Sequence, residues 1–590
     1  MAGNLTAMIA AAFSGSAAPP VTSDPYFEYT TLLLPGNGTN GAQNNTFLDS
    51  STNNFTITRN GNTTQGTFSP FSQTGWGNYF NGSSSLNASN AGFNPSGAFT
   101  VEFWFYPIDN TTFYQGLIST WPDGLVPAQG MFITKDGATC SIQLAANGSS
   151  VGIASFTWAT YLNQWNHIAF VRNSSDSCAV FLNGGRLAAP VTKSGSPGQT
   201  SLTIGRYFPN NANYYFTGYM SNVRFLNGSN AYDPASLTIT VPTTPFATNT
   251  TNQVLLTCQA NRFIDSNTAT TANTITVNGS PSVQAFSPFN PSASWSAATY
   301  GGSGYFDGNG DWLTIAEAPA LQLNSTAFSI ELWLYPSSVS ASRMIIGKRD
   351  TSGGSGYAFS WYIQGNSFGG FIFYSANGSL TSNNNVLIAN AWNHIAVTSD
   401  GTNVSMYANG SRVNTPTALI VGNSASSVYI GNFPVDNLYY QGNLADIRIQ
   451  KGVQTYTGTT YTVPTAPLTR DANTSLLLNY TNAGIYDATS KNDLETVDGA
   501  QISTAQSKFG GSSMAFDGTG DWLTNNNASN SLLAFGTGDF TIEGWFYSNN
   551  ASSAAQRGMF QTSDTIGGLK PNYTTGVPAP TVDKSAMPPA

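Results

Sequence analysis

The chain has 590 residues, which is too long for one hydrophobic core and predicts several domains. Only 8% of its residues are charged, against roughly 25% in an average soluble protein, and Asn, Ser, Thr and Gly take over the polar role. The net charge is -9 and no run of Lys or Arg occurs, so the sequence argues against nucleic acid as a partner, and no apolar run approaches the ~20 residues that cross a membrane.

The N-terminal segment LTAMIAAAFSGSAAPP is the one candidate for a targeting signal. A secretory signal begins with a positively charged region, whereas no Lys or Arg precedes Arg59. We therefore expect residues 1–25 to form an Ala-rich docking arm.

Three copies of one unit follow this segment. Each begins with a leucine strand, in which Leu34, Leu256 and Leu478 recur at a spacing of 222 residues. The next landmark is an aspartate segment, which reads FLDSSTNNFTITRNG, then FIDSNTATTANTITVNG, then IYDATSKNDLETVDG. A period of this length describes separate domains rather than the turns of a solenoid.

The later landmarks of the unit also keep their order. The glutamate strand reads FTVEFWFYP, FSIELWLYP and FTIEGWFYS in the three copies. After it, WNHIAFVR in the first copy matches WNHIAVTS in the second, and FTGYMSNVRFLNG matches YQGNLADIRIQKG. These matches predict one domain at 26–248 and a second at 249–470.

The third copy is predicted to be incomplete. Glu102 precedes Trp165 by 63 residues and Glu331 precedes Trp392 by 61, whereas 47 residues follow Glu543. A counterpart of WNHIA does not fit into that remainder, so we expect half a sandwich whose unpaired strand edges need another subunit.

The predicted partial domain spans 471–570 and is followed by a Pro-rich tail at 571–590. Proline cannot donate a ladder hydrogen bond, so we expect this tail to be an extended linker and not a strand.

Secondary structure follows from the alternation within the glutamate strand. Phe99, Val101, Phe103 and Phe105 fall on one face of FTVEFWFYP, and the residues between them fall on the other. Bulky side chains lie on both faces, so we expect both faces to be covered and the strand to be central. Short runs of this kind alternate with NG, DG and GG turns, so we predict an all-β fold of tandem antiparallel β-sandwiches.

The ordered motifs FDGNGDWLTI, FSIELWLYP, WNHIAV, YANG, YIGN and ADIRI resemble those of laminin-G-like, concanavalin A-like jelly-roll domains. The resemblance covers both complete copies and the start of the third, roughly 26–568. It implies a jelly-roll fold, but this fold carries lectins, adhesion modules and glucanases alike.

The tandem arrangement in a chain of low charge also resembles structural proteins of tailed-phage virions, particularly of cyanophages. That resemblance implies a tail fibre or a capsid-decorating fibre, made in the host cytoplasm, whose partners are other virion subunits and a host cell-surface glycan. It also implies a homo-oligomer, with the trimer as the usual form of a phage fibre, although no coiled-coil heptads support that number.

The repeated glutamate is a candidate catalytic group. Glycoside hydrolysis needs two carboxyl groups, about 5 Å apart for retention or about 6.5–9.5 Å for inversion, and the face of Glu102 carries Thr100, Trp104 and Tyr106 instead. The second carboxylate is missing, so we predict that the chain is not an enzyme, with a jelly-roll glycosidase as the alternative.

A structural Glu–His pair is the preferred interpretation of this glutamate. The chain has two histidines, His167 and His394, at matching positions of the WNHIA motif. Alternation places His167 on the face of Trp165 and Glu102 on the face of Trp104, so glutamate and histidine can meet across neighbouring strands under a tryptophan, as Glu331 and His394 can in the second copy. Acid–base catalysis is the rival interpretation.

No cofactor is predicted, and the sequence offers two candidates for a metal site, the cysteines for zinc and an aspartate turn for calcium. The cysteines Cys140, Cys178 and Cys258 are odd in number and far apart, which excludes a disulfide framework and a zinc cluster. The turn FDGNGDW places Asp307 and Asp311 like the first ligands of a calcium loop, but the later acidic ligand of an EF-hand is absent. We expect glycine turns whose aspartates cap backbone amides.

An aromatic cluster near predicted loops is the candidate for glycan contact. Aromatic faces beside amide groups suit the C–H surfaces and hydroxyls of sugars, and core packing is the alternative role. The cluster consists of Tyr207, Tyr214, Tyr215, Phe216 and Tyr219 in the first copy and of Phe433, Tyr439 and Tyr440 in the second.

Two functions therefore remain open from the sequence. The chain is a virion structural protein whose modules face the host or neighbouring subunits, or it is a secreted or surface-displayed carbohydrate-binding adhesin.

Overall fold

The computed structural model describes most of the two complete copies and parts of the third. The described residues are 44, 47, 56–61, 64–66, 72, 75–121, 129–207, 214–280, 282–285, 300–324, 326–349, 361–433, 437–480, 495–497, 500–508, 511–524, 541–547, 557–560, 570–574 and 577–581. The predicted docking arm at 1–25 lies outside them.

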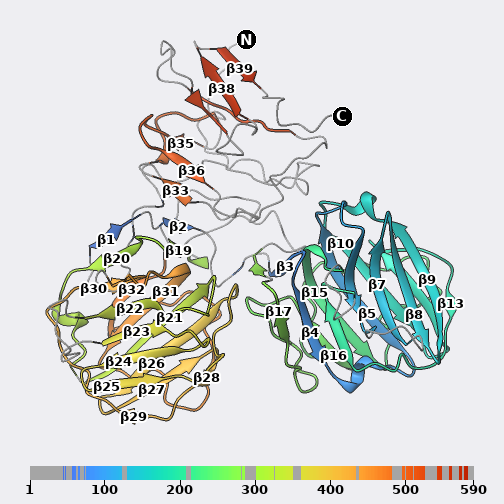
Figure 1. Cartoon of the computed structure of the whole chain (residues 1–590), viewed down its shortest axis with the longest axis horizontal. Coiled ribbons are helices and arrows are strands. Elements are labelled where there is room, and N and C mark those ends of the chain that lie inside the picture. The colour runs from blue at the N-terminus through green and yellow to red at the C-terminus, as the bar shows by residue number, and fades with distance from the viewer. Residues whose placement is uncertain are drawn as a thin grey trace, which may run out of the picture.

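The described residues form two large β-sandwiches and three small sheets, which confirms the all-β prediction. Figure 1 shows the two sandwiches side by side, with β33 close to β2 of the second sandwich and with β38 and β39 farther from both. No helix among the described residues is long and apolar enough to cross a membrane.

The first sandwich is built from the strands and 3-10 turns of the first copy and from three strands of the second. They are β3 (Gly77–Asn81), β4 (Ser85–Ser89), η3 (Ala91–Phe93), β5 (Phe99–Pro107), β6 (Tyr114–Ser119), β7 (Gly130–Asp136), β8 (Thr139–Ala146), β9 (Ser149–Thr157), η4 (Trp158–Tyr161), β10 (Asn166–Arg172), β11 (Ser177–Leu182), β12 (Gly185–Arg186), β13 (Val191–Thr192), β14 (Ser201–Ile204), β15 (Thr217–Asn227), β16 (Gln253–Thr257), β17 (Thr276–Asn278) and β18 (Ser282–Gln284). One sheet has the order β12-β11-β10-β5-β15-β3-β18, with β13 beside β11 and β16 beside β15. The opposite sheet has the order β17-β4-β14-β6-β7-β8-β9.

The second sandwich repeats this architecture. Its elements are β1 (Ile57–Asn60), β2 (Thr64–Gly66), β19 (Ser303–Asp307), β20 (Trp312–Ile315), η5 (Pro319–Leu321), β21 (Ala327–Pro336), β22 (Arg343–Lys348), β23 (Trp361–Gly365), β24 (Phe371–Ser375), β25 (Gly378–Thr381), β26 (Asn393–Asp400), β27 (Asn403–Ala408), β28 (Ser411–Arg412), β29 (Thr417–Ala418), β30 (Val428–Ile430), β31 (Gln441–Lys451) and β32 (Thr474–Leu478). Its sheets have the orders β2-β19-β31-β21-β26-β27-β28 and β1-β20-β30-β22-β23-β24-β25, with β29 beside β27 and β32 beside β31.

The glutamate strands are the central strands of these sandwiches. β5 lies between β10 and β15, and β21 lies between β26 and β31, all antiparallel. The predicted inward face is buried: Phe99, Val101, Phe103 and Phe105 belong to the core of the first sandwich. Burial of each such side chain contributes about 1.5–3 kcal/mol, so this strand anchors the core.

Strand pairing crosses both predicted domain boundaries. β16 follows the boundary at 248 and pairs with β15, and β32 follows the boundary at 470 and pairs with β31. Two strands of the second copy go further, because β17 and β18 pair with β4 and β3 at the edges of the two sheets of the first sandwich. In return, β1 and β2 of the first copy pair with β20 and β19 of the second sandwich, and Figure 1 shows both exchanges.

The third copy forms two short strand pairs of its own. β33 (Glu495–Val497) pairs with β36 (Trp522–Thr524), and β34 (Gln501–Ser503) pairs with β35 (Ser513–Ala515). The third glutamate strand is described at 541–547, where it lies outside regular strands and is exposed throughout, with Trp545 71% exposed.

The prediction that the Pro-rich tail contains no strand is wrong. β37 (Arg557–Gly558), β38 (Lys570–Thr574) and β39 (Val577–Thr581) form an antiparallel sheet in that order. Pro578 and Pro580 are two residues apart on the edge strand β39, so the positions that lack an N–H lie on one side of it. An edge strand needs hydrogen bonds on one side only, and this is the setting in which a sheet tolerates proline.

Candidate functional site

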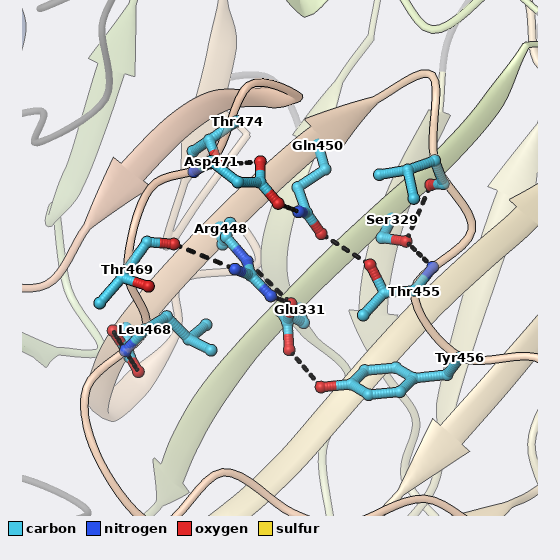
Figure 2. Close-up of polar contacts among 12 residues, drawn as sticks. Ser329, Glu331, Arg448, Gln450, Thr455, Tyr456, Leu468, Thr469, Asp471 and Thr474 are labelled. Carbon is cyan, nitrogen blue, oxygen red and sulfur yellow. Dashed lines mark hydrogen bonds and ion pairs between the residues drawn. The ribbon is translucent and has the colours of Figure 1, made fainter.

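The outer face of each central strand carries a buried polar network. Glu331 in β21 is fully buried, and its direct neighbour across the strand pair with β31 is Arg448. Arg448 donates two hydrogen bonds to Oε1 of Glu331, from Nε at 2.9 Å and from Nη2 at 2.5 Å. The hydroxyl of Tyr456 donates to Oε2 at 2.7 Å. Figure 2 shows the arginine and the tyrosine converging on this carboxylate from two sides.

The loop that delivers Tyr456 is itself tied to the central strand. The hydroxyl of Ser329, two residues before the glutamate, accepts the N–H of Thr455 at 2.8 Å. Thr455 in turn donates to Gln450 of β31 at 2.7 Å (Figure 2). Each polar side chain on this face of β21 therefore fixes part of the loop after β31.

The first sandwich repeats the network with matched residues. Arg224 donates to Oε1 of Glu102 from Nε at 3.0 Å and from Nη2 at 2.5 Å, and the hydroxyl of Tyr232 donates to Oε2 at 2.9 Å. Thr100 accepts the N–H of Ala231 at 2.8 Å, in the role of Ser329. Two copies with different sequences thus satisfy their buried carboxylate in the same way.

The structure brings together both predicted Glu–His pairs. Nε2 of His167 lies 3.3 Å from Oε2 of Glu102, and Nε2 of His394 lies 3.4 Å from Oε2 of Glu331. The tryptophan ring of each central strand packs beside the histidine, with ring centroids 5.2 Å apart in both copies. In the second sandwich the other ring nitrogen of His394 is 2.6 Å from the hydroxyl of Tyr461.

Sequence reasoning missed the arginine and tyrosine partners. The arginines stand in the matched segments SNVRF and ADIRI, and Tyr232 and Tyr456 follow each of them by eight residues. The equal spacing in both copies is the sequence signal that could have identified these partners. The third glutamate, Glu543, lies in the exposed segment 541–547, apart from any such network among the described residues.

The electrostatics of the network keep each glutamate ionised. Burial works to raise the pKa of Glu331, but His394 and Arg448 outweigh it and lower that pKa to about 2. The pKa of Glu102 is also lowered, because His167 and Arg224 outweigh its burial. A general acid at neutral pH needs a raised pKa, so neither glutamate suits that role.

The candidate calcium turns are closed by hydrogen bonds within the chain. Asp311 is fully buried and its carboxylate accepts the N–H of Asp307 at 2.9 Å, while Asp307 accepts the N–H of Asn309 at 2.6 Å. Asp521 and Asp517 make the same bonds in the third copy. Among the described residues no group of three or more His, Cys, Asp or Glu side chains is placed to hold a metal ion.

The predicted aromatic cluster divides between the core and the surface. Phe216 and Tyr440 are buried in the two sandwich cores, and Tyr219 packs with Tyr106 in a small separate cluster. Tyr215 lies under Arg206, whose guanidinium is 4.4 Å from the ring centroid, and Tyr439 lies beside Trp312. Tyr207, Tyr214 and Phe433 reach the outer face of the smaller sheet of their sandwich.

That outer face carries a row of tyrosines in the second sandwich. Strand register places Tyr429 of β30 opposite Gly347 of β22, Gly347 opposite Tyr362 of β23, and Tyr362 opposite Tyr374 of β24. The rings of Tyr362 and Tyr374 stack with centroids 4.3 Å apart. Tyr374 and Tyr429 are half-buried, so part of each ring faces solvent. We call Tyr362, Tyr374 and Tyr429 the tyrosine row.

Gly347 makes the close packing of this row possible. A Cβ at this position would lie 2.2 Å from the Cβ of Tyr362, which no side chain allows. The Tyr362 ring is further held by Phe433 and Met344 beneath it and by Arg349, whose guanidinium is 5.5 Å from its centroid. The tyrosine row is therefore a rigid aromatic surface rather than a set of mobile side chains.

In the first sandwich the outer face of the smaller sheet carries different side chains. The corresponding row, read across the strands, is Thr203, Ser119, Phe132 and Gln143. Phe132 packs against Trp121 and Tyr207 with centroids 5.4 and 4.7 Å away. Hydroxyl and amide groups with one phenylalanine thus replace the three tyrosines.

Comparison with known proteins adds a family match. A family profile described as the concanavalin A-like lectin/glucanases superfamily matches residues 80–231 and 306–456, which together are just over half of the chain. No curated protein matches the sequence.

Several solved structures are similar at low identity. Domains LG4-5 of the mouse laminin α1 chain are 10% identical over 66% of this chain and 94% of that chain, with a TM-score of 0.23. A pentraxin from Limulus polyphemus is 17% identical over 26% of this chain and 76% of that chain, with a TM-score of 0.20. Domain 4 of an extracellular arabinanase from Geobacillus stearothermophilus, solved with arabinotriose, is 17% identical over 26% of this chain and 72% of that chain, with a TM-score of 0.21.

The first prediction concerns His394. The variant His394→Gln loses the contact with Tyr461 and should lower the free energy of unfolding by about 1–3 kcal/mol, as expected for a buried polar group left without its partner. Thermal unfolding measures the loss, and ligand binding should be unchanged. Unaltered melting together with a lost activity would contradict the structural role.

The second prediction concerns Asp446, a buried neighbour of the network. Burial raises its pKa to about 7, against the lowering effect of the Leu468 N–H. The folded chain then holds a proton that the unfolded chain releases near pH 4, so stability falls as pH rises from about 4 to about 7, by at most about 1.4 kcal/mol per pH unit.

The matching residue of the first sandwich is Asn222, whose neutral amide accepts the N–H of Phe246. We therefore expect Asp446→Asn to remove this part of the pH dependence. Urea unfolding of variant and parent at pH 5 and pH 8 measures it, since the variant should gain stability relative to the parent at pH 8. If the free energies of unfolding of variant and parent differ by the same amount at pH 5 and at pH 8, the raised pKa of Asp446 is disproved.

Proposed function

Because this chain belongs to the concanavalin A-like lectin/glucanases superfamily, we propose that it is a non-enzymatic carbohydrate-binding protein of the adhesin type. The tyrosine row of the second sandwich is the observation that carries this proposal. It consists of the stacked Tyr362 and Tyr374 and of Tyr429 on the other side of Gly347, all on one sheet face, and the packing of Arg349, Phe433 and Met344 holds Tyr362 in place.

The chemistry of the row suits a sugar. A pyranose ring presents C–H groups on its faces and hydroxyls around its edge, so it packs on aromatic rings and takes hydrogen bonds from neighbouring polar groups. Tyr374 and Tyr429 offer ring surface and hydroxyls, and the half-buried Gln364 on the same face of β23 adds an amide. A rigid surface also loses little conformational entropy on binding.

The proposal of a binding role rather than hydrolysis rests on the glutamate networks. The oxygens of Glu331 are engaged by Arg448, Tyr456 and His394, and its lowered pKa opposes proton donation. Asp446, an acid whose charge interacts with Glu331, corresponds to Asn222 in the first sandwich, so this pair of carboxylates is not repeated there.

The setting that we propose for this binding is the virion of a tailed phage, as part of a tail fibre or of a capsid-decorating fibre. The support is the resemblance of the tandem, low-charge sequence to such proteins. In that setting the glycan would belong to the host cell surface, and the neighbouring chains would be other virion subunits.

The third prediction tests the tyrosine row. A glycan array probed with the labelled full chain should identify a bound sugar, and calorimetry should then show that Tyr374→Ala and Tyr429→Ala each weaken binding about tenfold, since an aromatic contact of this kind contributes about 0.5–1.5 kcal/mol beyond its buried area.

Two matched controls accompany these variants. Tyr374→Phe keeps the ring and should retain most of the affinity, and Phe113→Ala removes an aromatic ring of the first sandwich that is 59% exposed and should change nothing. If no glycan binds, or if the alanine variants bind as tightly as the parent, the proposed function is wrong.

A further inference from the structure

Each copy of the unit contains an arm of two consecutive strands that lie at the edges of two different sheets. The strands of the arm are β1 and β2 in the first copy, β17 and β18 in the second, and β33 and β34 in the third. We call these segments arm 1, arm 2 and arm 3. Arm 3 pairs with strands of its own copy, whereas arm 1 lies on the second sandwich and arm 2 lies on the first.

The exchanged arms bind their acceptor sheets in the same register. Ser282 of arm 2 pairs with Tyr79, the tyrosine that precedes Phe80 in the first sandwich. Thr64 of arm 1 pairs with Tyr305, which holds the matching position in the second. The two sandwiches therefore accept an arm in a common register, whichever copy the arm comes from.

Hinge length does not decide which sheet an arm uses. Residues 504–512 join arm 3 to β35 of its own copy, and residues 67–76 join arm 1 to β3 of the first sandwich. These hinges differ by one residue in length, yet one arm stays with its own sheet and the other lies on the neighbouring sandwich. An arm that makes equivalent contacts in two places is the kind of element that domain swapping exchanges between copies of a chain.

Arm 2 is held within the chain by contacts that reach both sandwiches. Val283 is fully buried, its N–H donates to the carbonyl of Asn390 at 3.0 Å, and its carbonyl accepts the hydroxyl of Tyr335 at 3.4 Å. Trp392 adds a backbone hydrogen bond to the carbonyl of Asn261 at 2.9 Å. Arm 2 therefore bridges its acceptor sheet and the second sandwich.

Arm 1 has a simpler attachment. Its described contacts are the strand pairs with β20 and β19, the packing of Ile57 against the core of the second sandwich, and the contact of β2 with β33 of the third copy. These contacts would be the same if the arm came from another molecule. The edges at β19 and β20 each need a strand to cover them, because an uncovered sheet edge is open to pairing with other chains.

We propose that arm 1 is an exchangeable arm and that its further acceptor is the second sandwich of another copy of this chain. Two copies then form a closed dimer in which each arm 1 covers the edge of the partner. Such an exchange is reciprocal, so it leaves no edge open and does not extend into a filament. Arm 2 keeps the two sandwiches of each chain together.

The fourth prediction is a crosslinking experiment on the full chain. Thr58 of arm 1 pairs with Thr314 of β20, and Thr276 of arm 2 pairs with Asn87 of β4. The native cysteines Cys140, Cys178 and Cys258 are buried, and burial raises the pKa of each thiol, so introduced cysteines react selectively.

Chains carrying Thr58→Cys alone are co-expressed with chains carrying Thr314→Cys alone and are treated with a short bis-maleimide. Neither chain can link within itself, so a covalent dimer on a denaturing gel is the expected result. The matched control is the pair Thr276→Cys and Asn87→Cys, which should give no covalent dimer when the changes are on separate chains and an internal link when they are on one chain.

Light scattering of the parent chain should give twice the mass of a monomer, at a concentration that also yields the covalent dimer. The inference is overturned if Thr58→Cys and Thr314→Cys link only when both are on one chain, or if arm 2 exchanges between chains as readily as arm 1. A failure of glycan binding leaves these outcomes unaffected, so the two proposals fail separately.

Discussion

The architecture of both sandwiches depends on a charged carboxylate placed in the middle of a central β-strand. Glu102 and Glu331 are fully buried, and an isolated charge in that position would cost far more free energy than the fold can supply. The chain offsets this cost with an arginine from one neighbouring strand, a tyrosine from the following loop and a histidine from the other neighbouring strand. The carboxylate therefore connects three neighbouring strands and one loop at a single point.

In each sandwich one sheet holds the structural network, and the other sheet presents the exposed face on which we place binding. The sheet with the glutamate is closed on its outer face by loops that the network holds, as Thr455 and Tyr456 illustrate. The outer face of the opposite sheet carries the tyrosine row in the second sandwich and hydroxyl and amide groups in the first. The glutamate network is the same in both sandwiches, whereas the side chains on the outer face of the opposite sheet differ between them. The same fold can therefore be repeated with different binding faces.

Much of this could be predicted from the sequence, because alternation and repetition are local signals. The central strand and the Glu–His contacts follow from period two within FTVEFWFYP and WNHIA. Arg224 and Tyr232 were missed because their positions depend on strand order and on a loop, which no short window contains. The exchange of arm 1 and arm 2 could not be predicted, since similar arms fit either sandwich and only the tertiary structure selects one. The strands of the Pro-rich tail were missed because tolerance of proline depends on which strand lies at the edge.

The architectural role of the buried glutamate is the central claim, and the variant Glu331→Gln tests it most directly. Glutamine keeps the size of the side chain but removes the charge that faces Arg448, so the free energy of unfolding should fall by about 3–5 kcal/mol, as when one partner of a buried ion pair is lost. The folded variant should keep the glycan affinity of the parent and should gain or lose no hydrolytic activity. A variant that unfolds like the parent, or one that stays folded but loses an activity present in the parent, would contradict the account.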